Sequence, residues 1–182
     1  MAKSNLEQDI LKVLVTEEEL AKRVNELGAE LFDKFADKNP IFVGVLKGCF
    51  IFMADLIRNV DLHCTMDFMA VSSYSGTSST GAVKITKDLS QDIEGRHIII
   101  VEDILDSGVT LSYLKKYLEV RNPASISIAT LLDKPARRKA DVYADYFCFE
   151  VPDAFVVGYG LDYNEVYRNL PYIGVLKPEM YS

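Results

Sequence analysis

The segment from His97 to Leu111 constrains the fold of this chain more than any other. It opens with an apolar run of strand length, reaches the adjacent acids Glu102 and Asp103, and continues into a polar turn at 106–108. A helix is predicted to follow over 109–119, opening at that turn. This succession of strand, acids, turn and helix is typical of α/β domains, in which ligands bind beyond the carboxyl ends of the strands.

The rest of the chain favours the same fold class. Thr16 and Glu19 have the spacing of a capping box, and apolar residues then recur at steps of three and four until Asn39-Pro40, which predicts one long helix. A further helix is predicted over 50–60. Segments of strand character are 41–46, 64–71, 83–87, 97–102, 125–132, 146–151 and 155–157. Strands that alternate with helices predict an α/β fold with a mainly parallel central sheet.

No internal repeat or long linker divides the sequence, so residues 1–182 are interpreted as a single domain. The first 15 residues give no structural prediction.

Composition excludes several classes of protein. The net charge of −7 disfavours a general nucleic-acid surface, which normally has a basic footprint. No apolar run approaches the roughly 20 residues that cross a bilayer, and the amino terminus lacks a secretion signal. The three cysteines cannot all pair and have no metal-ligand spacing to a histidine. We therefore expect a cytoplasmic protein without a membrane partner.

Each part of the 97–111 segment has a chemical use. A helix amino terminus offers free N–H groups and a positive dipole end to a phosphate. Gly108 allows close approach of the backbone, and Ser107 and Thr110 add hydroxyl donors. The carboxylates suit magnesium or sugar hydroxyls. The alternative is that Asp106 or Ser107 only caps the helix and that the paired acids are only solvated.

The polar segment 72–81 lies between two predicted strands. Gly76 and Gly81 have the spacing of a P-loop, but Ala82-Val83 follows in place of the lysine and hydroxyl residue, so a nucleoside-triphosphate loop is excluded. No dinucleotide-binding glycine pattern occurs. The segment is interpreted as a solvated hairpin connection or as a lid over a reactive intermediate.

Val101 to Thr110 resembles the phosphoribosyl-pyrophosphate signature of type I phosphoribosyltransferases. Four further segments are similar to the hypoxanthine/guanine branch of that family: 45–48, 73–74, 131–134 and 155–165. The resemblance runs in the right order from about Ile41 to Ile173. It implies the type I phosphoribosyltransferase fold, with helices flanking the sheet, a small hood and a mobile lid loop.

The resemblance also implies an activity, purine salvage. The 5-phosphoribosyl group would pass from phosphoribosyl pyrophosphate to hypoxanthine or guanine, giving IMP or GMP and pyrophosphate, with Mg²⁺ as cofactor. The implied partners are these small molecules and further copies of the chain in a dimer or tetramer, without nucleic acid.

For the phosphoribosyl group, the resemblance implies that Glu102 and Asp103 bind the ribose hydroxyls, directly or through magnesium. A loop would wrap the 5′-phosphate through Asp106, Ser107, Gly108, Val109 and Thr110. Val109 belongs to this loop by position alone. Asp106 would be the catalytic base that exchanges a proton with N7 of the purine, unless it serves only as a helix cap.

For pyrophosphate, the resemblance implies a loop with Lys47 and Gly48, whose Leu46–Lys47 peptide can be cis in the family. Arg168 would contact the same group, although an ordinary surface charge is the alternative. Ser73 and Tyr74 would lie on the closing lid.

For the purine, the resemblance implies that Lys134 donates to the 6-oxo group and so selects oxopurines over adenine. Phe155 would stack on the ring, and the backbone of Val156 would contact its edge. Spacing alone would instead place Phe155 in a core strand. Asp162 would lie at the purine and hold a second magnesium through pyrophosphate.

Residues 137–139 give the region around Lys134 a basic character, which is interpreted as a solvated turn or a subunit contact. Two other functions remain open. One is an enzyme with the same fold and another base, such as xanthine. The other is a regulator that binds phosphoribosyl pyrophosphate and nucleic acid.

Overall fold

The computed structural model describes residues 5–73 and 83–181, and a six-stranded sheet forms its centre. The strands lie in the order β4-β3-β2-β5-β6-β7. Their bounds are β2 Ile41–Leu46, β3 Thr65–Ser73, β4 Val83–Lys87, β5 His97–Leu105, β6 Ser125–Asp133 and β7 Tyr146–Glu150. All neighbours are parallel except β3 and β4. The predicted α/β class with a mainly parallel sheet is confirmed.

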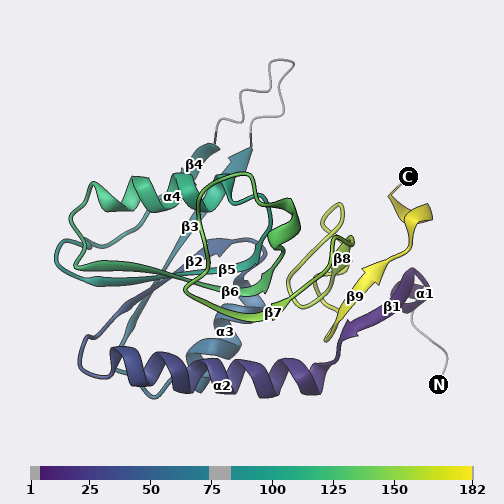
Figure 1. The fold of residues 1–182 in the computed structure, drawn as a ribbon, viewed down its shortest axis with the longest axis horizontal. Coiled ribbons are helices and arrows are strands. Elements are labelled where there is room, and N and C mark those ends of the chain that lie inside the picture. Colours follow the sequence, from purple (N-terminus) through teal and green to yellow (C-terminus); the bar gives the residue numbers. More distant parts are fainter. Residues whose placement is uncertain (1–4, 74–82, 182) are drawn as a thin grey trace.

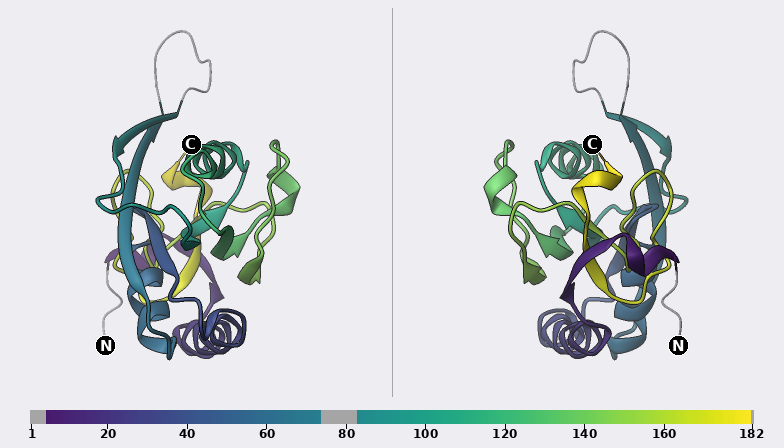
Figure 2. Two further views of the ribbon diagram at one scale, coloured as in Figure 1. Left: turned by 90° about the vertical axis from the view of Figure 1, so that its left-hand side faces the viewer. Right: turned by 90° about the vertical axis from the view of Figure 1, so that its right-hand side faces the viewer.

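Helices cover both faces of this sheet. α2 (Glu17–Phe35) and α3 (Phe50–Asn59) lie on one face, and α4 (Val109–Glu119) lies on the other (Figures 1 and 2). The capping box predicted at Thr16 is present, because Thr16 and Glu19 exchange hydrogen bonds. Two separate apolar clusters, one with residues of α2 and α3 and one with residues of α4, form the core. Strands covered on both faces are apolar throughout, as β2 is.

A second, three-stranded sheet forms the hood. Its strands are β1 (Ile10–Val15), β9 (Ile173–Leu176) and β8 (Val156–Val157), all antiparallel. The hood lies at one end of the central sheet (Figure 1). β1 and the short α1 (Asn5–Gln8) occupy the part of the sequence that gave no prediction, and β9 was also missed.

Strand β5 extends beyond its prediction, because it ends at Leu105 and not at Glu102. Its pairing with β6 continues to Leu105 and Asp133. Glu102 and Asp103 therefore lie within the strand, on a stretch that pairs with β6 beyond the end of its pairing with β2 at Val101, rather than in a free connection. Their carboxylates are fixed more firmly than the sequence suggested.

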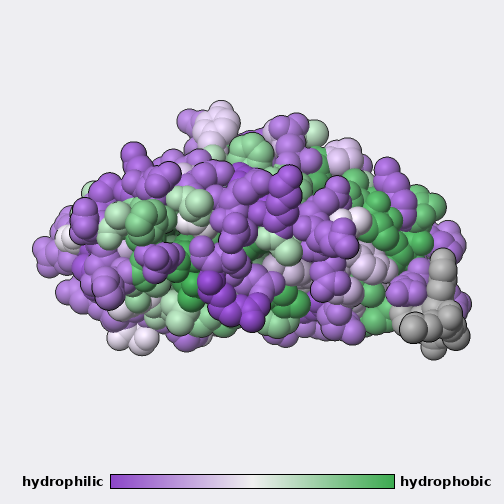
Figure 3. All heavy atoms as spheres, turned by 90° about the horizontal axis from the view of Figure 1, so that it is seen from below, coloured by the Kyte–Doolittle hydropathy of each residue, from purple (hydrophilic) through white to green (hydrophobic). Residues whose placement is uncertain are grey.

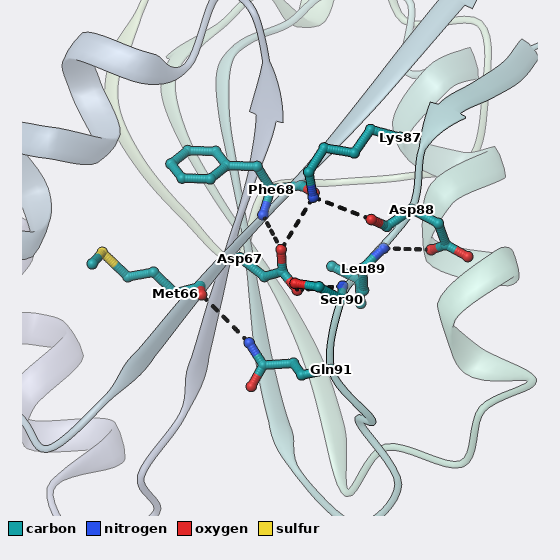
Figure 4. A network of polar contacts seen from close by, with 8 residues as sticks. All are labelled: Met66, Asp67, Phe68, Lys87, Asp88, Leu89, Ser90 and Gln91. Atoms are coloured by element: carbon teal, nitrogen blue, oxygen red, sulfur yellow. Dashed lines mark hydrogen bonds and ion pairs between the residues drawn. The ribbon is translucent and has the colours of Figure 1, made fainter.

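Asp67 is a buried carboxylate in β3 that anchors the segment after β4. Its Oδ1 accepts hydrogen bonds from Phe68 N at 2.7 Å and from Lys87 Nζ at 3.3 Å. Its Oδ2 accepts from Ser90 N at 2.7 Å and from Ser90 Oγ at 2.9 Å. Figure 4 shows these donors around the carboxylate. The next acid, Asp88, accepts a hydrogen bond from the Tyr117 hydroxyl of α4 at 2.6 Å. The segment after β4 is therefore bonded both to β3 and to α4.

The face seen from the α2 side is mostly hydrophilic, with smaller hydrophobic patches between (Figure 3). Within residues 5–73 and 83–181, no helix has the length and apolar character that a bilayer crossing requires.

Candidate active site

A cavity of about 460 Å³ lies between the carboxyl ends of β5 and β6 and the hood. It brings together six residues that the sequence predicted, namely Asp103, Asp106, Lys134, Phe155, Val156 and Asp162. Six further residues line it: Ile104, Arg137, Asp153, Ala154, Leu161 and Tyr181. The cavity lies where ligands of parallel α/β sheets bind.

Lys134 is almost fully buried, with 4% exposed. It directly follows β6, and its backbone N–H donates to the carbonyl of Leu105 at 3.0 Å. Its Nζ donates to the carbonyl of Ala154, at the hood side of the cavity, at 2.9 Å. An ammonium group has three donors, so two remain for a ligand.

Asp106 presents an unsatisfied oxygen. Its Oδ1 is buried without a hydrogen-bond partner in the described part of the chain, and Oδ2 lies 3.7 Å from Nη1 of Arg137. The N-cap of α4 is Gly108, and Ser107, not Asp106, bonds the start of the helix, since its Oγ accepts from Val109 N at 3.4 Å. The alternative role of Asp106 as a helix cap is therefore wrong. This oxygen lines the main cavity and is open to a hydrogen-bond donor from a ligand.

A smaller cavity of about 100 Å³ lies at the amino end of α4, lined by Glu102, Ser107, Gly108 and Thr110 among others. Gly108 has φ of +78°, and a Cβ there would come within 2.6 Å of Val142. The loop is held in place because the carbonyl of Ser107 accepts from Lys139 N at 2.9 Å and Ala140 N at 3.1 Å. Val109 is exposed at the first turn of the helix. This arrangement suits a phosphate.

Glu102 and Asp103 are half-buried on β5. Burial raises the pKa of Asp103 to about 6, against a hydrogen bond from Ile104 N at 2.9 Å and the charge of Arg168. Burial, together with the charge of Asp103, raises the pKa of Glu102 well above its ordinary value. Burial disfavours the negative charge of these two carboxylates. A bound cation or sugar hydroxyls would stabilise that charge.

The carboxylates fit a magnesium ion that is shared with a substrate. Among residues 5–73 and 83–181, no three metal-binding side chains form one cluster. Magnesium often takes only one or two carboxylates and completes its shell with water and substrate phosphates. A pair on β5 and the separate Asp162 match that mode.

The loop after β2 passes directly over Asp103. The Leu46–Lys47 peptide is cis. A Cβ at position 48 would overlap the Asp103 carboxylate, so only glycine fits there. Lys47 is exposed, and its Nζ lies 3.0 Å from Oε2 of Glu165. The neighbouring Cys49 is buried, and burial with the charges of Glu102 and Asp103 raises the pKa of its thiol, which excludes a reactive thiolate.

Arg168 lies within the site and not on an open surface. Its side chain is 18% exposed, with Nη1 donating to the Gly160 carbonyl at 2.8 Å. Its Nη2 lies 2.8 Å from Asp162 Oδ1 and 3.4 Å from Glu165 Oε2. Its Nε is buried without a partner among the described residues. The surface-charge alternative is wrong.

Phe155 is not a core residue, because 36% of it is exposed and it lines the main cavity. Its ring contacts Tyr163 and Tyr181. Val156 is buried in β8. The core-strand alternative therefore holds for Val156 and fails for Phe155.

Two predicted residues are not placed. Ser73 ends β3, but its side chain lies outside the described part, and Tyr74 lies outside the described residues altogether. The polar segment that was interpreted as a hairpin connection or a lid falls largely in the same gap.

Sequence reasoning assigned no site role to six lining residues of the main cavity, and three of these have polar or aromatic side chains. Arg137 joins Asp106 to Asp153 on the hood side, with its Nε 3.1 Å from Asp153 Oδ1. Residues 137–139 were interpreted as a solvated turn or a subunit contact, and no pattern in the sequence placed Arg137 in the cavity. Tyr181 and Asp153 gave no sequence signal.

Comparisons with known proteins agree with this geometry. A family model described as phosphoribosyl transferase domain matches residues 12–164. The chain is 61% identical over 178 residues to the hypoxanthine-guanine phosphoribosyltransferase of Bacillus subtilis, covering 97% of this chain and 99% of that protein. It is 55% identical over 179 residues to the bifunctional protein TilS/HprT of Listeria monocytogenes, covering 98% of this chain and 28% of that protein.

Among solved structures, a hypoxanthine phosphoribosyltransferase from Staphylococcus aureus has a TM-score of 0.96 and 52% identity, with both chains fully covered. A hypoxanthine phosphoribosyltransferase from Trypanosoma cruzi has a TM-score of 0.90 and 41% identity, covering 96% of this chain and all of that chain. The cavity at the carboxyl ends of β5 and β6, the family match and these relatives together place the chain in the phosphoribosyltransferase family.

Proposed function

We propose that this protein transfers the 5-phosphoribosyl group from phosphoribosyl pyrophosphate to hypoxanthine and guanine, releasing pyrophosphate. The observation that carries the proposal is the main cavity. It presents an unpartnered oxygen of Asp106, a buried ammonium of Lys134 and an exposed ring of Phe155 to one ligand. A planar base with an oxygen acceptor and a ring nitrogen satisfies all three.

The phosphoribosyl group binds at the amino end of α4 in this proposal. Backbone N–H groups of the 106–110 loop and the hydroxyls of Ser107 and Thr110 hold the 5′-phosphate. Glu102 and Asp103 hold the ribose hydroxyls and one magnesium ion. Magnesium, when bound, neutralises charge on the pyrophosphate and so makes it a better leaving group.

Pyrophosphate leaves toward the loop after β2. Gly48 lies beside Asp103, Lys47 pairs with Glu165, and Arg168 is held nearby by the Gly160 carbonyl. A guanidinium fork suits a bidentate contact to a phosphate. Asp162, now paired with Arg168, would hold the second magnesium, while Ser73 and Tyr74 would contact the pyrophosphate from the lid.

The reaction develops positive charge on the ribose as the bond to pyrophosphate breaks. Glu102 and Asp103 stabilise that charge because they are fixed in a half-buried setting. Asp106 Oδ1 accepts the proton from N7 of the purine, or returns it in the reverse reaction. No donor of the described protein competes for this oxygen.

Lys134 determines which purine binds. One of its N–H groups is used by Ala154, and another donates to the 6-oxo oxygen. Adenine has an amino group at that position, which would place donor against donor in a buried site. Buried sites built for one hydrogen-bonding pattern reject the opposite pattern strongly.

The test is steady-state turnover with phosphoribosyl pyrophosphate, magnesium and each of hypoxanthine, guanine, xanthine and adenine. We expect turnover of the first two, no measurable turnover of adenine, and complete loss of activity with a chelator. In Lys134→Gln, discrimination against adenine should fall while binding of phosphoribosyl pyrophosphate is kept. If xanthine is turned over as fast as hypoxanthine, the assignment of hypoxanthine and guanine as the substrates would be replaced. If no base is turned over, the enzymatic function would be contradicted.

A further inference from the structure

Tyr181 lies against Phe155 in the cavity that we assign to the purine. The two rings are stacked, with centroids 4.8 Å apart and planes inclined by 22°. Tyr163 completes the group, because its ring is T-shaped to Phe155 at 5.5 Å and to Tyr181 at 6.4 Å. One face of the Phe155 ring is therefore covered by an aromatic partner before a ligand enters.

Phe155 keeps an open surface despite these contacts. It is 36% exposed and lines the same cavity as Lys134 and Asp106. A ring has two faces, and the stacked tyrosine takes one of them. A purine that stacks on Phe155 takes the other face, which gives a column of Tyr181, Phe155 and base.

The hood, and not the central sheet, holds Tyr181 in place. Tyr181 follows the one-turn helix η2 (Pro178–Met180), and its N–H donates to the Pro178 carbonyl at 3.2 Å. Met180 packs against the apolar cluster of the hood. Lys177 N donates to the Asp9 carbonyl at 3.0 Å, which ties this segment to the start of β1.

We propose that Tyr181 is a positioning residue for the purine, acting through Phe155. It stacks on one face of Phe155 and, together with Tyr163, holds the ring at a fixed inclination to the cavity. The inference rests on the proposed function, since it takes Phe155 as the contact of the base. Aromatic pairs of this kind change binding constants by about two- to tenfold.

The experiment measures KM for hypoxanthine, guanine and phosphoribosyl pyrophosphate, with kcat, in Tyr181→Ala, Tyr181→Phe and Phe155→Ala. In Tyr181→Ala we expect the base KM to rise by about two- to tenfold, with kcat and the KM for phosphoribosyl pyrophosphate unchanged. Tyr181→Phe keeps the ring and should restore the wild-type values. Tyr143→Ala removes a tyrosine that is 72% exposed and lines none of the site, and serves as the matched control.

Three results would overturn the inference. A lower base KM in Tyr181→Ala would show that Tyr181 competes with the purine for Phe155. An unchanged base KM in Tyr181→Ala, beside a raised one in Phe155→Ala, would remove the role of Tyr181 and leave the proposed function intact. An equal rise in both KM values would indicate general loosening of the hood. An unchanged base KM in Phe155→Ala would instead contradict the purine contact in the proposed function itself.

Discussion

The acids on and directly after two strands of one sheet have opposite surroundings. Asp67 in β3 accepts hydrogen bonds from four protein donors. Burial alone would raise its pKa, but the backbone N–H groups of Ser90 and Phe68, the Ser90 hydroxyl and Lys87 lower it to about 2. On β5, which β2 separates from β3, burial raises the pKa of Glu102 and Asp103. Asp106, directly after β5, keeps an oxygen without a partner among the described residues.

The difference separates structural from reactive carboxylates. Where the protein supplies every donor, the charge is stabilised and the acid contributes to folding. Where donors are lacking, the folded protein is less stable and the acid is available to a ligand. Four substitutions test this division.

The largest effect is expected for Asp106→Asn. If Asp106 is the base, kcat should fall by about 10²- to 10⁴-fold. The free energy of unfolding should stay within about 0.5 kcal/mol of wild type, since Oδ1 has no protein partner to lose. Steady-state kinetics and urea unfolding measure the two quantities. The control, Asp153→Asn, removes another acid of the cavity and should change kcat by no more than about twofold. A near-normal kcat in Asp106→Asn would contradict the assignment of Asp106 as the base.

Asp67→Asn should show the reverse pattern. Replacing the carboxylate breaks bonds to buried donors, so we expect a loss of about 2 kcal/mol in the free energy of unfolding, with kcat near wild type at 25 °C. The same loss has a pH signature. Because the folded pKa lies below the ordinary 3.8, the stabilisation is complete above about pH 4 and disappears as pH falls toward 2. Urea unfolding of wild type and variant should converge in that range; a constant gap down to pH 2 would sink the structural role of this charge.

Asp103→Asn should stabilise the protein in metal-free buffer with chelator. Its folded pKa of about 6 exceeds 3.8, so the folded state binds the proton more tightly and wild type loses stability as pH rises from about 4 to 6. The variant has no carboxylate to ionise and does not lose stability in this way. Its free energy of unfolding should exceed that of the wild type by about 1 to 2 kcal/mol at pH 8 and equal it near pH 3.5. Thermal unfolding of the wild type and the variant at these two pH values measures the difference. A variant less stable than wild type at pH 8 would mean that the division between the two groups fails.

Lys87→Met should have the smallest effect. Its ammonium contacts Asp67, but the side chain is 45% exposed, so the ion pair is screened by solvent. We expect a loss of less than about 1 kcal/mol in the free energy of unfolding. A loss as large as that of Asp67→Asn would show that the lysine, and not the backbone donors, stabilises the carboxylate.

Local patterns in the sequence predicted much of the fold. The capping box at Thr16 and the apolar runs of β2 and β5 carry their own signals, since cap and periodicity act within a few residues. β1 was not predictable, because Ile10–Val15 becomes a strand through pairing with β9, which lies at the other end of the chain. Tertiary pairing of this kind leaves no local pattern.

The same distinction between local and tertiary signals applies to the residues of the candidate site. Residues 102–110 could be assigned from their order, because strand, turn and helix place them without help from elsewhere. Arg137 and Tyr181 could not, since their contacts with Asp106 and Phe155 join residues that lie far apart in the sequence. The placement of Ser73 and Tyr74 stays a prediction.

One backbone hydrogen bond has a consequence for how new substrates evolve in this family. Lys134 N donates to the Leu105 carbonyl, and Leu105 pairs with Asp133, so Asp106 and Lys134 start from adjacent positions on neighbouring strands. Strand spacing is fixed near 4.8 Å in every sheet, so selection has little freedom to change the separation of these two groups. Descendants with other base preferences should therefore differ in the hood, around Asp153 to Val156, and keep the strands unchanged.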